Sequence, residues 1–351
     1  MTITETANAR VPDANPDHPS HDIENLKVIP KRSYRTWVAT AIVAVLVTMV
    51  LHSLATNPKW EWHVVSQYLT WPSVLTGLRG TLLLTVVSAV IGFGLGTILA
   101  LMRLSKSSLL QSVSWGYTWV FRSVPLILQL LLWYNLAYLY PTLSLGIPFG
   151  PSFYEFGTLD VINKFGAAIL GLGLSQAAYS AEIVRAGILG VDQGQHEAAA
   201  ALGIPAARQN YRIILPQAMR TIVPTSMNEI IGLVKGTSVV YVLAYNELFY
   251  TVGVIYGRNQ RVIPLLMVAA IWYLIITTAI TIVQYYVERH YAKGAVRTLP
   301  PTPLQSLRWT TSLAFSRLTG RAPDPNIPIS FMVRSTANRN HLVRGTTSPK
   351  N

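Results

Sequence analysis

Charged and polar side chains stand inside stretches of this chain that are otherwise apolar. Ser175, Tyr179 and Glu182 are spaced i, i+4 and i+7, so a helix would carry them on one face, and Asn228 and Lys235 repeat the seven-residue spacing. Placing such groups in a nonpolar medium is costly, so they mark candidate functional positions. The two faces together offer an anion and a cation, and they predict a polar lining along a path through the protein.

Three further polar residues belong to this candidate lining: Arg122, Gln129 and Arg185. A structural alternative exists, in which Glu182 pairs with Arg185 at i+3 and Lys235 pairs with another helix, purely for packing. Either role fits any one of these residues, whereas the shared spacing favours a lining for the set.

Other chemistries lack the residues that they need. No Gly-x-x-x-x-Gly-Lys-Ser/Thr string occurs, so the chain supplies no nucleotide site of that kind. His52, His63, His196 and His290 show no metal-ligand spacing, the chain has no cysteine, and no nucleophile is paired with a base. We therefore expect no catalytic residues, no metal and no cofactor bound by this chain.

The composition points to a membrane protein. Of the 351 residues, 51% are hydrophobic and 12% are charged, against about a quarter charged in soluble domains. The net charge of +13 is concentrated beside apolar segments and in the C-terminal tail, which fits the cytoplasmic flanks of membrane spans better than a nucleic-acid surface. Nucleic acid is therefore not an expected partner, whereas membrane lipid is.

Apolar runs of about 20 residues can cross the hydrocarbon core of a bilayer. The chain contains six such runs: Thr36–Pro58, Thr81–Met102, Gly116–Leu139, Phe165–Leu189, Thr221–Val242 and Val262–Val287. The fold class predicted is an all-α polytopic membrane protein with about six transmembrane helices. The run at 36–58 is long for a signal peptide, so we expect a retained span rather than a cleaved leader.

The segments between and outside these runs have distinct compositions. Residues 1–35 and 291–351 are polar or basic without an apolar period, which predicts disordered tails. Lys59–Ser73 is rich in Trp and suits a membrane interface, as does the amphipathic stretch Leu243–Arg261. Pro141–Lys164 is predicted to be an external loop. Gly92, Gly94 and Gly96 predict close helix packing rather than a phosphate loop.

Residues 190–218 form a polar-edged, helix-prone segment between two apolar runs. Asp192 can cap a helix, with Gln195 returning the bond, and four alanines follow Glu197. Gly203 stands where a helix ends in a left-handed residue. The pattern predicts a short helix, a glycine turn, and a second helix that starts after Pro205 and ends before Pro216.

This segment resembles the "EAA" motif of bacterial ATP-binding-cassette (ABC) importer permeases. The positions that match, with the adjoining leucine, are Glu197, Ala198, Ala199, Leu202, Gly203, Ile213, Leu215 and Pro216. The resemblance implies a type I ABC importer permease fold over residues 75–290. It also implies docking of this loop onto a separate ATPase dimer that binds ATP and Mg, a solute-binding protein outside the cell, and a second permease subunit, identical or related.

Further strings are similar to those of polar amino-acid permeases of the histidine, glutamine, arginine and opine type. They are Phe121–Leu126 with Gln129, Ala178–Glu182 with Arg185, and Asn228-Glu229 followed by Leu233–Ser238. Ser123, Val124, Ala186 and Gly236 depart from the usual residues. The resemblance implies a polar amino acid as substrate, without separating the kinds, and a transport subunit rather than an enzyme.

The basic residues set the expected orientation. One side of a six-span chain holds both tails and the basic residues Arg103, Lys106, Arg208, Arg212 and Arg220. The positive-inside rule makes that side cytoplasmic. We expect a multi-pass protein of the bacterial inner membrane with both termini in the cytoplasm. A permease for another small solute, or a channel or sensor not driven by ATP, is the alternative, but a passive channel needs no ATPase-docking loop.

Overall fold

The computed structural model describes residues 34–147 and 150–291, with short pieces at 305, 308–313, 316 and 327. The two predicted tails lie almost wholly outside these residues. The chain divides into two compact units, residues 1–60 and 61–351, which are described separately.

The first unit contains α1 (Tyr34–Thr56) and the single turn η2 (Pro58–Trp60). The most apolar 18-residue stretch within residues 37–56 of α1 has a mean hydropathy of 2.3, and none of it is buried within the protein. A helix that is apolar all round and unburied by protein suits a lipid environment. The helix expected at 36–58 is therefore present, at nearly the expected bounds.

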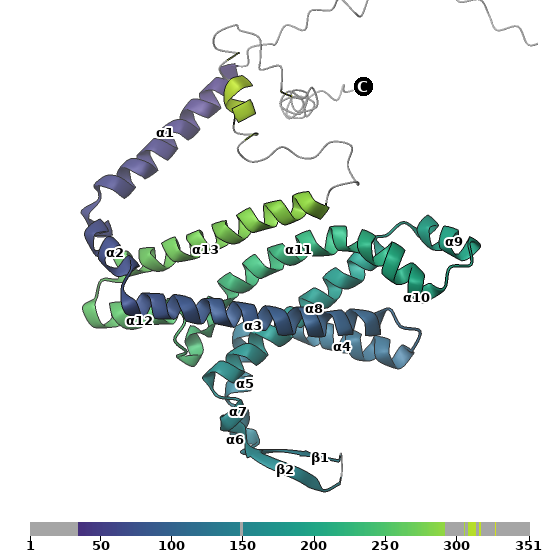
Figure 1. The fold of residues 1–351 in the computed structure, drawn as a ribbon. Coiled ribbons are helices and arrows are strands. Elements are labelled where there is room, and N and C mark those ends of the chain that lie inside the picture. Colours follow the sequence, from purple (N-terminus) through teal and green to yellow (C-terminus); the bar gives the residue numbers. More distant parts are fainter. Residues whose placement is uncertain are drawn as a thin grey trace, which may run out of the picture. The chain divides into compact units, whose positions relative to one another are not determined.

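The second unit is built around two long helices, α3 (Pro72–Arg103) and α8 (Lys164–Leu189), which pack along each other (Figure 1). The predicted start of α3 at Thr81 is wrong by nine residues, because the helix begins at Pro72. Trp71 is extended and Pro72 takes the first helical position, where its missing N–H costs nothing. The segment at 59–73, expected at the membrane interface, contains the helix α2 (Trp62–Leu69).

Small residues bring α3 and α8 together. A Cβ at Gly92 would lie 2.5 Å from Cγ of Gln176, and one at Gly96 would lie 2.5 Å from Cβ of Ser180. A Cβ at Gly94 would meet nothing within 4 Å. The predicted packing role is confirmed for Gly92 and Gly96, whereas Gly94 lies on another face.

The predicted third span is broken rather than continuous. It comprises α4 (Ser108–Ser123), α5 (Leu126–Tyr134) and the short α6 (Leu136–Leu139). Val124 is extended because it precedes Pro125. The side-chain amide of Gln129 donates to the carbonyls of Phe121 (3.0 Å) and Val124 (2.8 Å) across the break.

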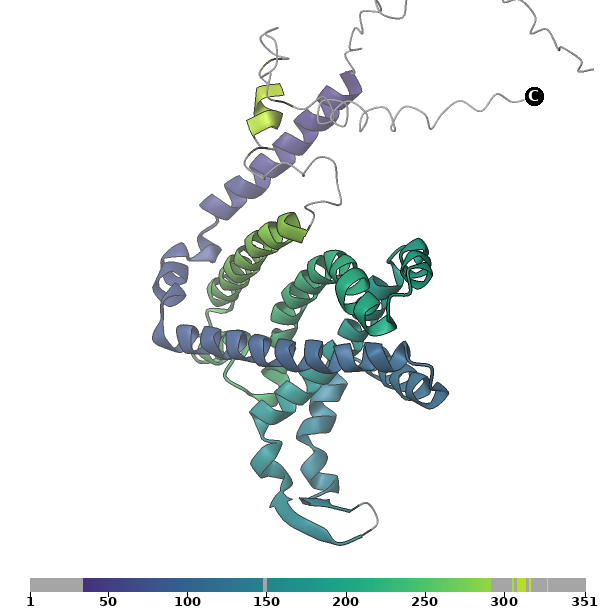
Figure 2. The ribbon, with the colours of Figure 1, turned by 45° about the vertical axis from the view of Figure 1, so that its right-hand side comes forward.

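A β-hairpin interrupts the otherwise helical fold where a loop was expected. Strands β1 (Thr142–Gly146) and β2 (Ser152–Gly157) pair antiparallel, and α7 (Thr158–Val161) follows. Figures 1 and 2 show the hairpin projecting from the end of α5, α6 and α7. Thr158 donates a hydrogen bond to the Tyr140 carbonyl beside the base of the hairpin.

The C-terminal half of the second unit is a series of helices. In order they are α9 (Gln193–Ala201), α10 (Ala206–Gln209), the π-helical turn η3 (Asn210–Ile214), α11 (Leu215–Gly236), the 3-10 helix η4 (Thr237–Leu243), α12 (Leu248–Asn259) and α13 (Val262–Tyr291). The interfacial stretch expected at 243–261 consists mostly of α12, whose Leu248 and Val252 are fully buried against α3 and α13.

Four helices in the described part of the chain are long and apolar enough to cross a membrane: α1, α3, α8 and α13. A fifth crossing results if residues 206–243 and α12, bent by 48° at their junction, count as one span. The predicted third span, at 116–139, is not among them, because its helical pieces are separated at Pro125.

A buried carboxylate holds the bend before α12. Glu247 is fully buried and accepts hydrogen bonds from the N–H groups of Phe249 (2.9 Å) and Tyr250 (2.5 Å), as the N-cap of α12. The hydroxyl of Thr81 on α3 donates to Oε2 of Glu247 (3.4 Å), and that of Tyr273 on α13 does so at 3.3 Å. This side chain therefore joins three helices.

Candidate functional site

The segment 190–218 begins with the capped helix α9. The carboxylate of Asp192 accepts from the N–H of Gly194 (2.8 Å), so the predicted cap is confirmed. The predicted return bond from Gln195 is wrong, because Oε1 of Gln195 accepts from Gln217 on α11 instead (3.2 Å). This bond ties the start of α9 to the start of α11.

The turn after α9 has the geometry expected of Gly203. Its φ is +64°, and its N–H donates to the carbonyl of Ala200 (3.0 Å). The N–H of Ile204 donates to the carbonyl of Ala199 (3.0 Å). These two bonds close a Schellman motif, which satisfies carbonyls at the end of α9. Pro205 stands at the N-cap position of α10, immediately before its first helical residue, Ala206.

The second helix of the segment does not end before Pro216. The N–H of Leu215 donates to the carbonyl of Asn210, five residues back, so a π turn joins α10 to α11. Proline cannot donate an N–H, and at the beginning of α11 this costs no regular helical bond. The side-chain amide of Gln217 donates to the Ile213 carbonyl (3.0 Å), which supplies a local donor there.

The segment 190–218 has a fixed backbone and several exposed side chains. Nε2 of Gln209 lies 3.0 Å from Nδ1 of His196, which holds α10 against α9. Ala199 is buried, whereas the side chains of Leu202 and Tyr211 are 78% and 74% exposed. Glu197, Ala198, Gly203, Leu215 and Pro216 are also exposed, and Ile213 is half-buried. Exposed apolar side chains on a fixed backbone are typical of a protein-binding surface.

Some of the predicted lining residues come together on α8. Oε2 of Glu182 lies 2.7 Å from the Arg185 guanidinium, and both side chains are half-buried. The guanidinium of Arg122, at the end of α4, lies 5.4 Å from the ring centroid of Tyr179, a cation–π distance. Ser175 is half-buried one turn before Tyr179.

Other predicted lining residues lie apart from this group. Gln129 is buried and its amide bridges the α4–α5 break. Oδ1 of Asn228 accepts from Gln284 (3.1 Å), which links α11 to α13. Lys235 is exposed, and its ammonium forms no ion pair with any residue that the structure describes.

Glu229 lies with the polar residues of α8 and Arg122, although the helical spacing in the sequence did not single it out. Its carboxylate, half-buried on α11, faces Gln176 of α8 and lies within electrostatic reach of Arg122 of α4. The signal in the sequence was an acidic residue inside an apolar span, next to Asn228. Arg122, Tyr179, Gln176 and Glu229 together form a polar cluster, here called the three-helix cluster. It holds one cation and one anion, so it can bind a solute that carries both charges.

Within the described ranges, no group of three His, Asp or Glu side chains could hold a metal ion. The three-helix cluster offers charged and hydrogen-bonding groups between helices. Such groups can bind a solute and change its surroundings as the helices move.

Residues 92–293, more than half of the chain, match the family described as binding-protein-dependent transport system inner membrane component. The chain belongs to this family. This permease is thus a membrane transport component, as its motifs predicted.

Two curated relatives and one solved structure show how far the similarity extends. The arginine transport system permease protein ArgU of Corynebacterium glutamicum is 40% identical over 79% of this permease and 87% of its own length. The glutamate/aspartate import permease protein GltK of Escherichia coli is 34% identical over 67% and 99%. A chain in the crystal structure of an amino acid ABC transporter with histidines is 32% identical, and the match covers 64% of this permease and 97% of that chain, with a TM-score of 0.55. The predicted type I importer fold is confirmed.

Proposed function

We propose that this permease imports polar amino acids as the membrane-spanning subunit of an ATP-driven transporter. Its relatives carry the names of arginine and glutamate/aspartate permeases, and the similar solved structure is an amino acid transporter. ATP and Mg would be bound by a separate ATPase dimer, since the chain has no phosphate-binding Gly-Lys-Ser/Thr string.

The observation that carries the substrate class is the three-helix cluster. An amino acid has a carboxylate and an ammonium group, which need a cationic and an anionic partner a short distance apart. Arg122 and Glu229 interact across α4 and α11, and the Tyr179 ring lies under the guanidinium. A solute that enters between them can place its carboxylate at Arg122 and its ammonium at Glu229, so that each side chain gains a charge-assisted contact.

The segment 190–218 is the proposed contact with the ATPase. The Schellman turn and the bond between Gln209 and His196 fix its shape, and Leu202 offers an apolar anchor. A solute-binding protein would deliver substrate at the opposite end, and a second permease subunit, identical or related, would complete the pathway. These partners follow from the family, whose description includes dependence on a binding protein.

The orientation proposed for this permease places 190–218 in the cytoplasm. Figures 1 and 2 show α9 and α10 at the same end of the second unit as the connection from α3 to α4. Arg103 ends α3 and Lys106 lies in this connection. Positive charge at one end supports a cytoplasmic location in the inner membrane. With α4 and α5 counted as one broken crossing, the chain crosses six times and both termini are cytoplasmic. A reporter that is active only outside the cytoplasm, fused after Ala292, should stay silent.

The test of the substrate site is uptake of radiolabelled arginine, glutamate and glutamine in cells that express the full transporter. Arg122→Gln and Glu229→Gln should each lower the uptake of the transported amino acid at least about tenfold, the loss of one charge-assisted contact. Membrane abundance and association with the ATPase should stay normal.

Arg79→Gln is the matched control, because Arg79 is an exposed arginine of α3 that takes no part in the cluster. Native uptake by both cluster variants would place the substrate path elsewhere. Loss of both variants from the membrane would show that the charges are structural. Uptake that persists when ATP hydrolysis is blocked would indicate a passive channel.

A further inference from the structure

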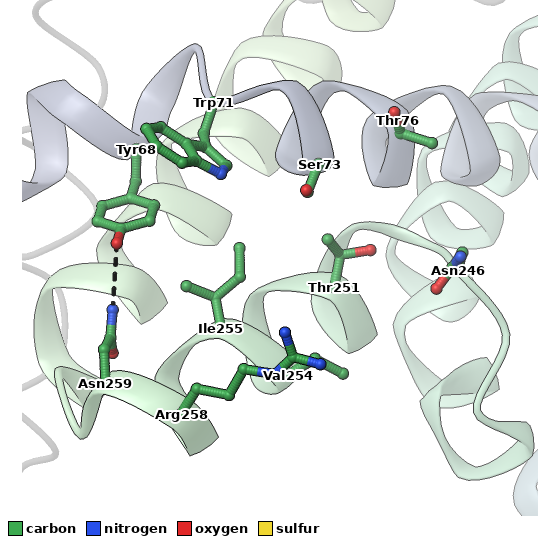
Figure 3. A pocket seen from close by; sticks show the side chains of 10 residues that line it. All are labelled: Tyr68, Trp71, Ser73, Thr76, Asn246, Thr251, Val254, Ile255, Arg258 and Asn259. Atoms are coloured by element: carbon green, nitrogen blue, oxygen red, sulfur yellow. Dashed lines mark hydrogen bonds between the residues drawn. The ribbon is translucent and has the colours of Figure 1, made fainter.

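A cavity of about 460 Å³ lies between α2, the first turns of α3, and α12. Figure 3 shows Arg258 and Ile255 of α12 on one side, with Trp71 and Ser73 on the other. The hydroxyl of Tyr68 accepts a hydrogen bond from Asn259 (3.4 Å), which closes one end, and the rings of Tyr68 and Trp71 are 5.2 Å apart. The three-helix cluster contributes no residue to this cavity.

The cavity contains a cation without a counter-ion. Arg258 and Arg261 lie one turn apart, against the expected sign of charge for this end of the molecule. The guanidinium of Arg261 forms an ion pair with Glu61 (3.1 Å), so its charge is compensated. Arg258 lines the cavity and forms no ion pair or hydrogen bond within the part of the chain that the structure describes.

Two further donors face the same space. Figure 3 shows the indole nitrogen of Trp71 and the hydroxyl of Ser73 beside the cavity, and neither group has a hydrogen-bond partner among the described residues. The opposite wall includes the aliphatic side chains of Val254 and Ile255. The site therefore combines three unused donors, one of them charged, with an apolar side. This is the chemistry that an anion attached to an apolar body requires.

The cavity lies at a boundary between membrane and water. At a rise of 1.5 Å per residue, Ser73 is about 40 Å along α3 from Ala100, which packs beside the start of α11. This length exceeds the hydrocarbon core of about 30 Å, so the first turns of α3 reach the headgroup region opposite the 190–218 segment. Trp and Tyr side chains are enriched at that depth.

We propose that this cavity binds the phosphodiester headgroup of a glycerophospholipid. The Arg258 guanidinium binds the phosphate oxygens, Trp71 Nε1 and Ser73 Oγ donate to the phosphate or the glycerol oxygens, and the first acyl carbons lie along Val254 and Ile255. A lipid at this place contacts α2, α3 and α12 together. It would therefore stabilise the junction beside the bend at Glu247.

The experiment uses the full chain in complex with its ATPase, purified in detergent and depleted of lipid. Phosphatidylglycerol is titrated, and the bound lipid is counted by native mass spectrometry while the melting temperature is followed. Dioleoylglycerol, which has the same tails without phosphate, and inorganic phosphate are the two comparison ligands. Phosphatidylglycerol should bind and raise the melting temperature, whereas the other two should not.

Arg258→Gln should weaken phosphatidylglycerol binding about tenfold, or about 1.4 kcal/mol. Arg258→Lys should retain most of the binding, and Arg79→Gln, an exposed arginine of α3 outside the cavity lining, should not change it. Equal melting temperatures of the lipid-free proteins would show that the variants fold.

Undiminished lipid binding by a folded Arg258→Gln variant would overturn the proposal. A melting shift by inorganic phosphate equal to that by the lipid would also overturn it, in favour of a free-anion site. If Arg258→Gln kept the lipid but lost binding of the solute-binding protein, the cavity would be a protein-docking socket instead.

Discussion

Adding one methyl group at three neighbouring glycines of α3 tests the packing of the two central helices. Gly92 and Gly96 face α8, and a Cβ there would lie 2.5 Å from carbon atoms of Gln176 and Ser180. Carbon atoms in contact prefer about 3.5–4.0 Å, so α8 must move away by about 1 Å. The neighbours of Gly96 include the Ala177 carbonyl at 2.8 Å, which is backbone and cannot rotate aside.

Gly96→Ala should therefore destabilise the permease by about 1–3 kcal/mol, the usual cost of overpacking. Gly94 is the control within the same helix, because nothing lies within 4 Å of its Cβ position. Gly94→Ala should be neutral or stabilising by up to about 1 kcal/mol, since alanine favours the helix.

The assay is the melting temperature of each purified full-length variant in one detergent. It is measured from the loss of the monodisperse peak in size-exclusion chromatography after heating. The expected order is Gly94→Ala at or above the native protein, with Gly92→Ala and Gly96→Ala clearly below it. Equal melting temperatures for Gly94→Ala and Gly96→Ala would refute the close approach of α3 and α8.

Three further changes separate backbone, hydrogen-bond and charge effects. Gly203→Val should reduce uptake and ATPase association while the spans stay folded, because a β-branched residue is strained at φ +64° although the space around it is open; normal uptake with a normal complex would contradict the coupling role. Thr81→Val removes a buried hydroxyl that accepts from the first N–H of α12 (3.1 Å) and should cost about 1–3 kcal/mol in a melting assay. Thr97→Val, an exposed position whose hydroxyl bonds only within α3, should cost less, and equal losses would reject the role of Thr81. Glu182→Gln removes the ion pair with Arg185 and should lower amino-acid uptake per molecule without lowering membrane abundance; native uptake would leave that pair with a packing role.

Local signals in the sequence predicted the parts of the fold that depend on local physics. The left-handed turn at Gly203 and the cap at Asp192 depend on neighbouring residues, and both were found where the pattern put them. The break at Pro125 was also readable, since a residue before proline avoids the helical region, but the apolar run across it suggested one continuous span. Length and hydropathy alone do not detect such a break.

The remaining features depend on contacts between distant segments. Gln195 was expected to bond its own helix, but Gln217, 22 residues later, supplies a better-placed donor. The burial of Glu247 depends on Thr81 and Tyr273, which belong to other helices. The approach of Glu229 to Arg122 likewise follows from how α4, α8 and α11 pack, and a single sequence contains no direct record of that packing.

The π turn between α10 and α11 has a mechanical consequence. Residues 206–243 form one continuous run of helical turns before the bend at Glu247, with Pro224 inside it. No flexible linker lies along it to absorb a push applied at α10. Tilting the α10 end by a few degrees would displace the other end, which lies next to Glu247. The buried carboxylate of Glu247 accepts hydrogen bonds from α3 and α13 there. A displacement at α10 would therefore be transmitted through these helical turns to the junction at Glu247.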